Sequence, residues 1–176
     1  MWLKRLWKRT KNSSRSGDIE LKKIAYRGGI IDFSIPRTWI EEYGDEGGGV
    51  FYEDAEDSGT LRVNVMTFAS NRNSEAIDVD VEAKTKAKEN NGVAIILDDG
   101  NALVKYEKDA LENGENLKIT FWEVYNPVPQ NHLRIAVFSY TLLSSQFDLP
   151  NFQQELELLD REIANVRFAT QLGEMG

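Results

Sequence analysis

Short runs in which apolar and polar residues alternate recur along the chain from about residue 30, and this pattern predicts β-strands. In Ile31–Ile35 every second residue is apolar, and Pro36 follows directly, which suits the end of a strand. Short connectors with Asp-Gly or Asn-Gly pairs separate several of the later runs, so neighbouring strands are expected to run antiparallel. The further predicted strands are Val50–Tyr52, Leu61–Phe68, Val93–Leu97, Ala102–Tyr106, Leu117–Tyr125 and Leu133–Leu143.

Both faces of these predicted strands carry apolar groups. Leu61, Val63 and Val65 share one face of their strand, whereas Met66 and Phe68 share the other. An antiparallel sheet with one face in water usually alternates apolar and polar residues more cleanly. We therefore expect other elements to cover both faces of the sheet, at least in part.

The segment Asn151–Phe168 has the period of an amphipathic helix. Its apolar residues recur at spacings of 4, 3, 4 and 3, which places them on one stripe of a helix. Pro150 suits the first turn of such a helix. The residues of the stripe are Phe152, Leu156, Leu159, Ile163 and Val166.

A second helix is predicted from Ser74 to just before the Asn90–Gly92 turn. Acidic residues stand in its early turns and lysines near its end, as the helix dipole favours. A strand is the alternative, because Ile77, Val79 and Val81 also alternate.

The order of the predicted elements indicates an α+β fold. Its central antiparallel sheet has about six or seven strands, with helices packed on the faces of that sheet. Thr38–Tyr43 adds at most one helical turn. A chain of 176 residues suits one domain with a tail, which we place as a basic tail and linker at 1–18 and a single domain at 19–176.

The composition excludes several classes of chemistry. The chain has no cysteine, so disulfides, thiolate metal sites and cysteine nucleophiles are excluded. No apolar run is long enough for a membrane-spanning helix, and the basic start lacks the apolar region of a secretory signal. We therefore expect a protein that is not exported and that resides in the cytoplasm, with a possible contact to the inner face of the membrane.

The net charge of −8 conceals an asymmetry along the chain. Residues 1–15 carry six basic and no acidic side chains, so the remainder of the chain carries a net charge of −14. A body this acidic repels phosphate backbones, which makes nucleic acid a poor partner. The same charge favours a basic protein partner.

The basic tail has the spacing of a short amphipathic helix, with apolar residues mostly on one side and basic residues on the other. Such a helix can lie on an anionic membrane surface. A disordered, soluble tail is the alternative, and the sequence leaves both interpretations open. The candidate membrane-surface residues are Trp2, Leu3, Lys4, Arg5, Leu6, Trp7, Lys8 and Arg9.

Candidate catalytic and metal-binding residues are few. The one histidine, His132, follows a loop at a predicted strand start, where an exposed position is expected, so a serine triad has no support. The acidic cluster Glu53, Asp54, Glu56 and Asp57 lacks the ligand spacing of an EF-hand loop, and we expect it to be a solvated turn. No catalytic residue, metal or cofactor is predicted.

Two tryptophans, Trp39 and Trp122, have apolar neighbours in the sequence. Such aromatic side chains can stack on a ligand, but in this setting they usually belong to the core. We expect both of them in the core.

The residues Phe33-Ser34-Ile35-Pro36-x-x-Trp39 resemble the opening motif of the PsbP-like superfamily. This group includes the photosystem II extrinsic protein, the yeast Ran-binding Mog protein, DcrB-type proteins and effector-associated chaperones of type VI secretion. The order of elements after the motif is also similar, over about residues 22–168. The resemblance implies a central antiparallel sheet with helices on both sides, in proteins that mostly bind other proteins and share no catalytic residues.

The leading hypothesis is therefore a non-enzymatic protein-binding module, such as a secretion-associated chaperone or an immunity-type protein. One alternative is a peripheral membrane protein held by the basic tail. A second alternative is a hydrolase that uses carboxylates and water alone.

Overall fold

The computed structural model describes residues 19–69, 77–129 and 131–170. In chain order, the elements of these ranges are β1 (Leu21–Tyr26), β2 (Ile31–Pro36), β3 (Ile40–Tyr43), β4 (Gly49–Tyr52), β5 (Thr60–Ala69), α2 (Val79–Glu89), β6 (Val93–Ile96), β7 (Ala102–Glu112), β8 (Glu115–Val128), β9 (His132–Leu143), a 3-10 turn (Ser144–Gln146), α3 (Pro150–Ala164) and β10 (Arg167–Phe168). No helix in these ranges is long and apolar enough to cross a membrane.

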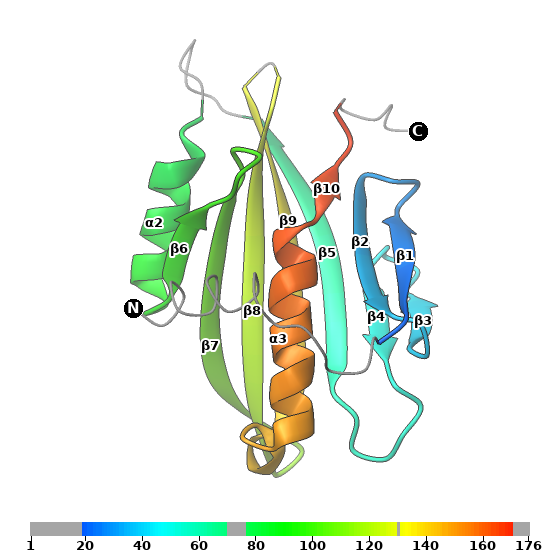
Figure 1. The fold of residues 1–176 in the computed structure, drawn as a ribbon. Helices are drawn as coiled ribbons and strands as arrows, with labels where there is room; N and C mark the ends of the chain where they lie inside the picture. The colour runs from blue at the N-terminus through cyan, green and yellow to red at the C-terminus, as the bar shows by residue number, and fades with distance from the viewer. Residues whose placement is uncertain (1–18, 70–76, 130, 171–176) are drawn as a thin grey trace.

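Two antiparallel sheets form the framework of the fold (Figure 1). The larger sheet has seven strands in the order β3-β4-β5-β9-β8-β7-β6, and the smaller sheet has three in the order β1-β2-β10. Every paired strand is antiparallel to its neighbour. The predicted α+β class with a large antiparallel sheet is therefore confirmed.

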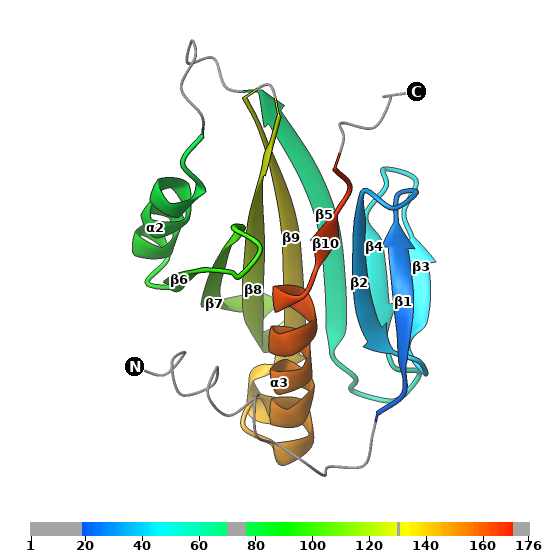
Figure 2. The ribbon, with the colours of Figure 1, turned by 45° about the horizontal axis from the view of Figure 1, so that its top comes forward.

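Different elements cover the two faces of the larger sheet. Neighbouring residues of a strand point to opposite faces, so Leu103 and Val104 of β7 mark the two sides. Leu103 belongs to a core cluster with α3 and the smaller sheet, whereas Val104 packs in a second cluster with Val79, Ala83 and Ala87 of α2. Figure 1 shows α3 in front of β8 and β9, β1 and β2 in front of β4, and α2 beside β6, and Figure 2 shows the same elements turned by 45°. The prediction that helices pack on both faces is confirmed.

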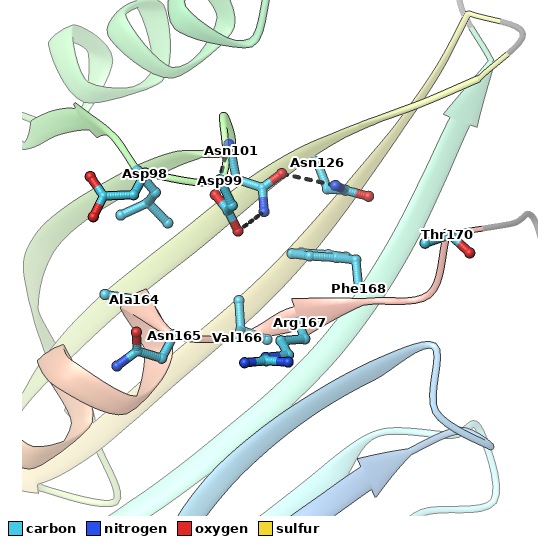
Figure 3. A pocket seen from close by; sticks show the side chains of 11 residues that line it. Asp98, Asp99, Asn101, Asn126, Ala164, Asn165, Val166, Arg167, Phe168 and Thr170 are labelled. Atoms are coloured by element: carbon cyan, nitrogen blue, oxygen red, sulfur yellow. Dashed lines mark hydrogen bonds between the residues drawn. The ribbon is translucent and has the colours of Figure 1, made fainter.

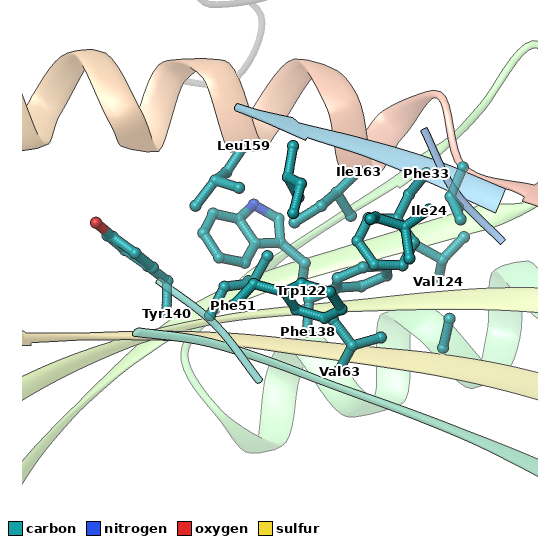
Figure 4. Close-up of a cluster of buried hydrophobic side chains, with 14 of the residues drawn as sticks. Ile24, Phe33, Phe51, Val63, Trp122, Val124, Phe138, Tyr140, Leu159 and Ile163 are labelled. Atoms are coloured by element: carbon teal, nitrogen blue, oxygen red, sulfur yellow. The ribbon is translucent and has the colours of Figure 1, made fainter. Parts of the chain in front are cut away.

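Trp122 lies in the middle of the main core, between the larger sheet and α3. Its side chain is fully buried, and Leu159 and Ile163 of α3 lie beside it (Figure 4). Phe138 of β9 and Phe33 of β2 belong to the same cluster. The predicted core position of Trp122 is confirmed.

The motif Phe33-x-x-Pro36-x-x-Trp39 serves packing. The ring of Phe33 meets the rings of Phe51 and Phe138 edge-on, at centroid distances of 5.5 and 5.3 Å. Trp39 is buried and stacks on Tyr140, with centroids 6.1 Å apart and planes within 7°. The motif therefore joins β2 and the turn after it to the larger sheet.

The Asn-Gly turn predicted between the strands at Ala102–Tyr106 and Leu117–Tyr125 closes the β7–β8 hairpin. Asn113 and Gly114 have φ angles of 51° and 82°. Two consecutive positive φ values are the requirement of a tight hairpin turn, and Asn followed by Gly meets it at low cost. The local sequence thus sets the register of this long hairpin, in which Glu112 lies opposite Glu115.

The predicted helical turn at Thr38–Tyr43 is wrong. Ile40–Tyr43 forms β3, and Ile40 lies opposite Tyr52 of β4. A single helical turn orders several residues for one hydrogen bond, whereas a strand beside β4 gains a ladder of them.

The predicted extent of the terminal helix is also wrong at its end. α3 stops at Ala164, and Asn165 caps it by donating from its side-chain amide to the carbonyl of Arg161 at 2.9 Å. The chain then forms β10, which pairs with β2. Val166 still reaches the core, so the whole apolar stripe is buried as predicted.

The other helix begins later than predicted. Asp78 is its N-cap, because its carboxylate accepts hydrogen bonds from the backbone of Asp80 and Val81 at 3.0 and 3.3 Å. Ser74 lies outside the described residues. The strand alternative for this segment is wrong.

The sequence analysis did not predict β1. This strand carries adjacent lysines, and the side chain of Lys22 forms an ion pair with Glu41 at 2.7 Å. Charged residues of this kind are typical of a strand at a sheet edge. They interrupt the alternation of apolar and polar residues from which β1 could have been predicted.

Candidate binding surfaces

α2 leaves part of the second face of the larger sheet uncovered. It packs against β6, β7 and β8, whereas β9 and β5 continue past it. Met66 and Phe68 of β5 are 41% and 48% exposed on this face. Ile135 and Val137 of β9 and Phe121 of β8 are half-buried beside them. We call these five residues the open face.

The strand registers make the open face continuous. Met66 lies opposite Ile135, and Asn64 lies opposite Val137. Arg62 and Asn64 are exposed along its border, and Ser139 continues the border on β9. Contiguous exposed apolar side chains with a polar rim are typical of a surface that another molecule covers. The open face is therefore the leading candidate for a docking surface.

A buried carboxylate joins α2 to the sheet next to the open face. Glu123 of β8 accepts hydrogen bonds from the hydroxyls of Tyr106 and Tyr125 at 2.7 and 2.6 Å. Lys86 of α2 approaches the same carboxylate at 3.3 Å. Burial and the adjacent Glu123 raise the pKa of both tyrosines well above the ordinary value of 10. The two phenols therefore stay protonated as donors, and the network holds α2 in place.

A groove of about 700 Å³ lies on the other face of the sheet (Figure 3). One wall is the Leu97–Asn101 loop with Asn126 of β8, and the other wall is Ala164–Thr170, which contains β10. Phe168 lies across the space between the two walls (Figure 3). A volume of this size can hold a small ligand or several residues of a peptide.

Three polar side chains of the groove, those of Asp99, Asn101 and Asn126, are engaged with one another. Asn101 donates to Asp99 from its side-chain amide at 2.7 Å, and it accepts from the amide of Asn126 at 2.8 Å. The carboxylates of Asp98 and Asp99 point in different directions in Figure 3. They do not form a facing acid–base pair, so this arrangement gives the hydrolase alternative no support.

A buried ion pair anchors α3 on the sheet. Lys105 of β7 lies 2.7 Å from the carboxylate of Asp160, and the indole N–H of Trp122 donates to the same carboxylate at 2.7 Å. Side chains from β7, β8 and α3 thus meet at one group. The groove wall that follows α3 depends on this anchor for its position.

A second carboxylate of α3 contacts the sheet near Trp39. The hydroxyl of Tyr140 donates to Glu155, and burial raises the pKa of Glu155 above its ordinary value of 4.5. Burial and the nearby Glu155 raise the pKa of Tyr140 as well. The hydroxyl also leaves no space beside Gly59, where an added Cβ would lie 2.0 Å from it.

We expect Glu155→Gln to raise the melting temperature at neutral pH. The folded protein binds the Glu155 proton more tightly than the unfolded chain, so ionisation destabilises the fold as pH rises above 4.5. Glutamine stays neutral and can still accept from Tyr140. Melting curves should show a gain at neutral pH that disappears well below pH 4.5. The exposed Glu157→Gln is the control; an equal gain from it, or a gain that persists in acid, would contradict this account.

The sequence-predicted site residues are only partly placed. Trp2–Arg9 lie outside the described residues, so the membrane-surface set stays a prediction. His132 is partly buried at the start of β9 rather than exposed. The acidic cluster lies in the exposed turn between β4 and β5, and no group of three His, Asp or Glu side chains suited to a metal occurs within the described ranges.

The sequence analysis missed the groove and all three buried carboxylate contacts. The groups of the α3 anchor are separated by 55 and 38 positions in the chain. No local motif connects such residues. Met66 and Phe68, in contrast, were placed correctly on a face of their own.

Comparison with known proteins identifies the fold. A scan against protein-family models finds no match, and no curated protein matches the sequence. Among solved structures, this chain is similar to LpqN of Mycobacterium tuberculosis, which is described as involved in cell envelope biogenesis. The TM-score is 0.58 and the sequence identity is 14%, and the match covers 81% of this chain and 88% of LpqN. The Ran-binding protein Mog1p of Saccharomyces cerevisiae is similar with a TM-score of 0.52, 12% identity and coverage of 86% and 96%. The chain has a Mog1-like fold.

This finding confirms the fold implied by the resemblance to the PsbP-like group. A structure from Bacteroides thetaiotaomicron is also similar, with a TM-score of 0.57 and 18% identity over 84% of this chain. The matched region spans 48% of that longer chain. At these identities the similarity establishes the fold and leaves the function to the surfaces of this chain.

Proposed function

We propose that this protein is a binding module that receives an apolar segment of another protein on its open face. The observation that carries the proposal is the row of exposed Met66 and Phe68 next to half-buried Ile135, Val137 and Phe121. Methionine and phenylalanine are common at protein interfaces, where they supply apolar contact area. The part of the partner that contacts the open face is a segment whose apolar residues recur on one of its faces.

The charge of the chain supports a partner with basic residues outside that contact. Beyond residue 15 the net charge is −14, which attracts a basic protein over long range and raises the rate of encounter. The Mog1-like fold agrees with this class of function, because Mog1p is described as Ran-binding. Within the class we propose a chaperone or an immunity-type protein, since each holds one protein partner without turning over a substrate.

We expect a photo-crosslinker at position 68 to capture a defined protein in the native host. The same probe at position 111 is the control, because Leu111 is 71% exposed on the β7–β8 hairpin, away from the open face. The double variant Met66→Asp, Phe68→Asp should lose the captured partner in a binding assay with purified proteins. Its free energy of unfolding should change little, since both side chains are already exposed.

Equal crosslinking at positions 68 and 111 would contradict the proposal. A double variant that folds normally and binds the purified partner as well as the wild type does would also exclude the open face. The melting temperature of the variant separates a lost contact from a lost fold.

A second candidate function rests on the basic tail. Leu3, Leu6 and Trp7 fall at helical spacing, with Lys4 and Lys8 on the other side, which suits contact with an anionic membrane surface. Each basic residue near such a surface contributes about 1 kcal/mol. We propose this contact as an addition to protein binding, because the tail and the open face are different parts of the chain.

We expect the full chain to co-sediment with vesicles that contain anionic lipid and to stay in solution with neutral vesicles. Lys4→Glu with Lys8→Glu should strongly weaken that binding, because the two changes lower the net charge of residues 1–15 from +6 to +2. Arg62→Glu removes an exposed cation of the folded part and serves as control. If the tail variant and the control bind equally, the membrane function is excluded.

A further inference from the structure

Among the described residues, one edge of the larger sheet lacks the protection that edge strands usually have. β6 is the last strand of the sheet, and its sequence, Val-Ala-Ile-Ile, contains neither charge nor proline. The opposite edge strand, β3, carries Glu41 and Glu42, and β1 carries Lys22 and Lys23. Charged residues on an edge discourage pairing with another chain, and an apolar edge invites it.

Exposed apolar side chains gather at this same edge. Val93 and Ile96 of β6 are 47% and 50% exposed, and Val81 of the adjacent helix α2 is 55% exposed. α2 runs antiparallel to β6 beside it (Figure 1). Val93 and Ile96 therefore flank the edge on opposite faces of the sheet, since they lie opposite Lys105 and Ala102 of β7, whereas Val81 lies on the side of α2 away from its buried residues.

The charged residues of α2 show which flank of the helix faces the edge. Lys86 reaches Glu123 on β8, toward the middle of the sheet. At about 100° per residue, positions 80, 84 and 88 lie on the other flank, which therefore faces the β6 edge. This flank has an acid at its start and bases toward its end, and Asp80 pairs with Lys84 within the helix.

We propose that a second copy of this chain covers the edge, with β6 of one copy pairing antiparallel to β6 of the other about a two-fold axis perpendicular to the sheet. The pairing joins two seven-stranded sheets into one continuous sheet. It buries Val93 and Ile96 of both copies. This inference does not depend on the proposed function of the open face.

The geometry of α2 fits this arrangement. Residues directly opposite each other in an antiparallel pair point to the same face, so the two-fold axis passes beside one residue of β6, here Ile95, rather than between two. Lys84 and Ile95 each lie about 10 Å from the Asn90–Gly92 turn, at ~1.5 Å per helical residue and ~3.3 Å per strand residue. The two-fold axis therefore passes level with Lys84. α2 lies over β6 and β7, so its axis is about one strand spacing, ~4.8 Å, from the two-fold axis. The axes of the two copies of α2 are therefore about 10 Å apart. Packed helices lie at about this spacing.

Two of the three charged positions on the flank are complementary under this symmetry, whereas the two Lys84 side chains face each other across the axis. The two-fold rotation makes the two copies of α2 antiparallel, with the axis level with Lys84. Asp80 of each copy therefore lies opposite Lys88 of the other copy, which gives one such contact on each side of the axis. Lys84 retains its own partner, Asp80, within its helix. An isologous interface requires such self-complementarity, and a charge pattern of one sign would have excluded it.

Sedimentation velocity of the full chain over a concentration series tests the proposal. The wild type should pass from monomer to dimer as concentration rises, with weak affinity because the interface is small. Val93→Lys with Ile96→Lys should remain monomeric at every concentration. Leu111→Lys, at a position on the β7–β8 hairpin that is 71% exposed, should dimerise as the wild type does. Thermal melts verify that each variant is folded.

A mixing experiment tests the orientation. Lys88→Asp gives a copy with acids at both positions 80 and 88, and Asp80→Lys gives a copy with bases at both positions, so each variant alone should repel itself. An equimolar mixture should form a heterodimer, because both contacts across the axis then join opposite charges. A misfolded variant cannot restore association in this way.

A wild type that stays monomeric at millimolar concentration overturns the proposal. That result is expected if the natural partner of the β6 edge is a strand of another protein rather than a second copy. Dimers that persist in the Val93→Lys, Ile96→Lys variant overturn it as well. A mixture that associates no better than its separate components excludes the antiparallel arrangement.

Discussion

Replacing Leu159 by alanine is expected to lower the free energy of unfolding by about 2–5 kcal/mol. Leu159 is almost completely buried in the main core, where it lies beside the indole of Trp122 (Figure 4). The substitution removes apolar contacts and leaves a cavity between α3 and the sheet, which the rigid aromatic neighbours cannot fill. Because small proteins are stable by only about 5–15 kcal/mol, this is a large fraction of the total. Chemical denaturation followed by tryptophan fluorescence measures it.

Leu149→Ala is the matched control for this variant. Leu149 is the same residue type, one position before α3, but nearly half of it is exposed. Its substitution should cost less than about 0.5 kcal/mol, as is usual for exposed positions. Similar losses from the two variants would show that α3 does not depend on its buried stripe.

Replacing Asp160 by alanine is expected to destabilise the protein by about 3–5 kcal/mol. The change removes the carboxylate that lies 2.7 Å from the buried ammonium of Lys105. It also removes the acceptor of the Trp122 indole N–H, which lies in a fully buried side chain. A buried charge that loses its counter-charge is costly because the interior solvates it poorly. Denaturant unfolding measures the change in the free energy of unfolding.

The double variant Lys105→Met, Asp160→Leu shows whether the loss of stability in Asp160→Ala comes from the unpaired charge or from the lost side-chain volume. Apolar replacement of a buried ion pair is often neutral or stabilising, so the double variant should recover the part of the loss that comes from the unpaired Lys105 charge. The part that comes from the Trp122 N–H should remain, because leucine offers that donor no acceptor. Asp109→Ala is the exposed comparison, since Asp109 pairs with Lys118 at the surface. It should cost less than about 1 kcal/mol. A loss from Asp109→Ala as large as that from Asp160→Ala would show that burial is not the cause.

The strands of the later part of the chain were predictable because their information is local. Alternation along Leu61–Phe68 separated Leu61 and Val63 from Met66 and Phe68, and the structure confirms that division. The Asn113-Gly114 pair indicated a tight hairpin, and its positive φ angles show why. Strand periodicity and turn geometry each depend on residues only a few positions apart.

The binding surfaces were less predictable, because each requires a decision about packing. Alternation placed Met66 and Phe68 on the second face, but it could not show that α2 stops short of them. The groove depends on β10, which the sequence did not reveal. The helical spacing of apolar residues continues through Val166, so the sequence predicted a helix where the chain forms β10. The pairing of β10 with β2 overrode that local period.

The sequence by itself determined the class of fold, the faces of the strands and most of the core, including the stripe of α3 and the positions of Trp39 and Trp122. It did so because the need to bury apolar side chains acts through a period that is visible in any short window of residues. Only the tertiary structure decided which side chains stay exposed, where Asp160 meets Lys105 and Trp122, and which strand lies at the unprotected edge. These outcomes depend on contacts between segments far apart in the chain, whose register and coverage are set by the packing of the whole molecule.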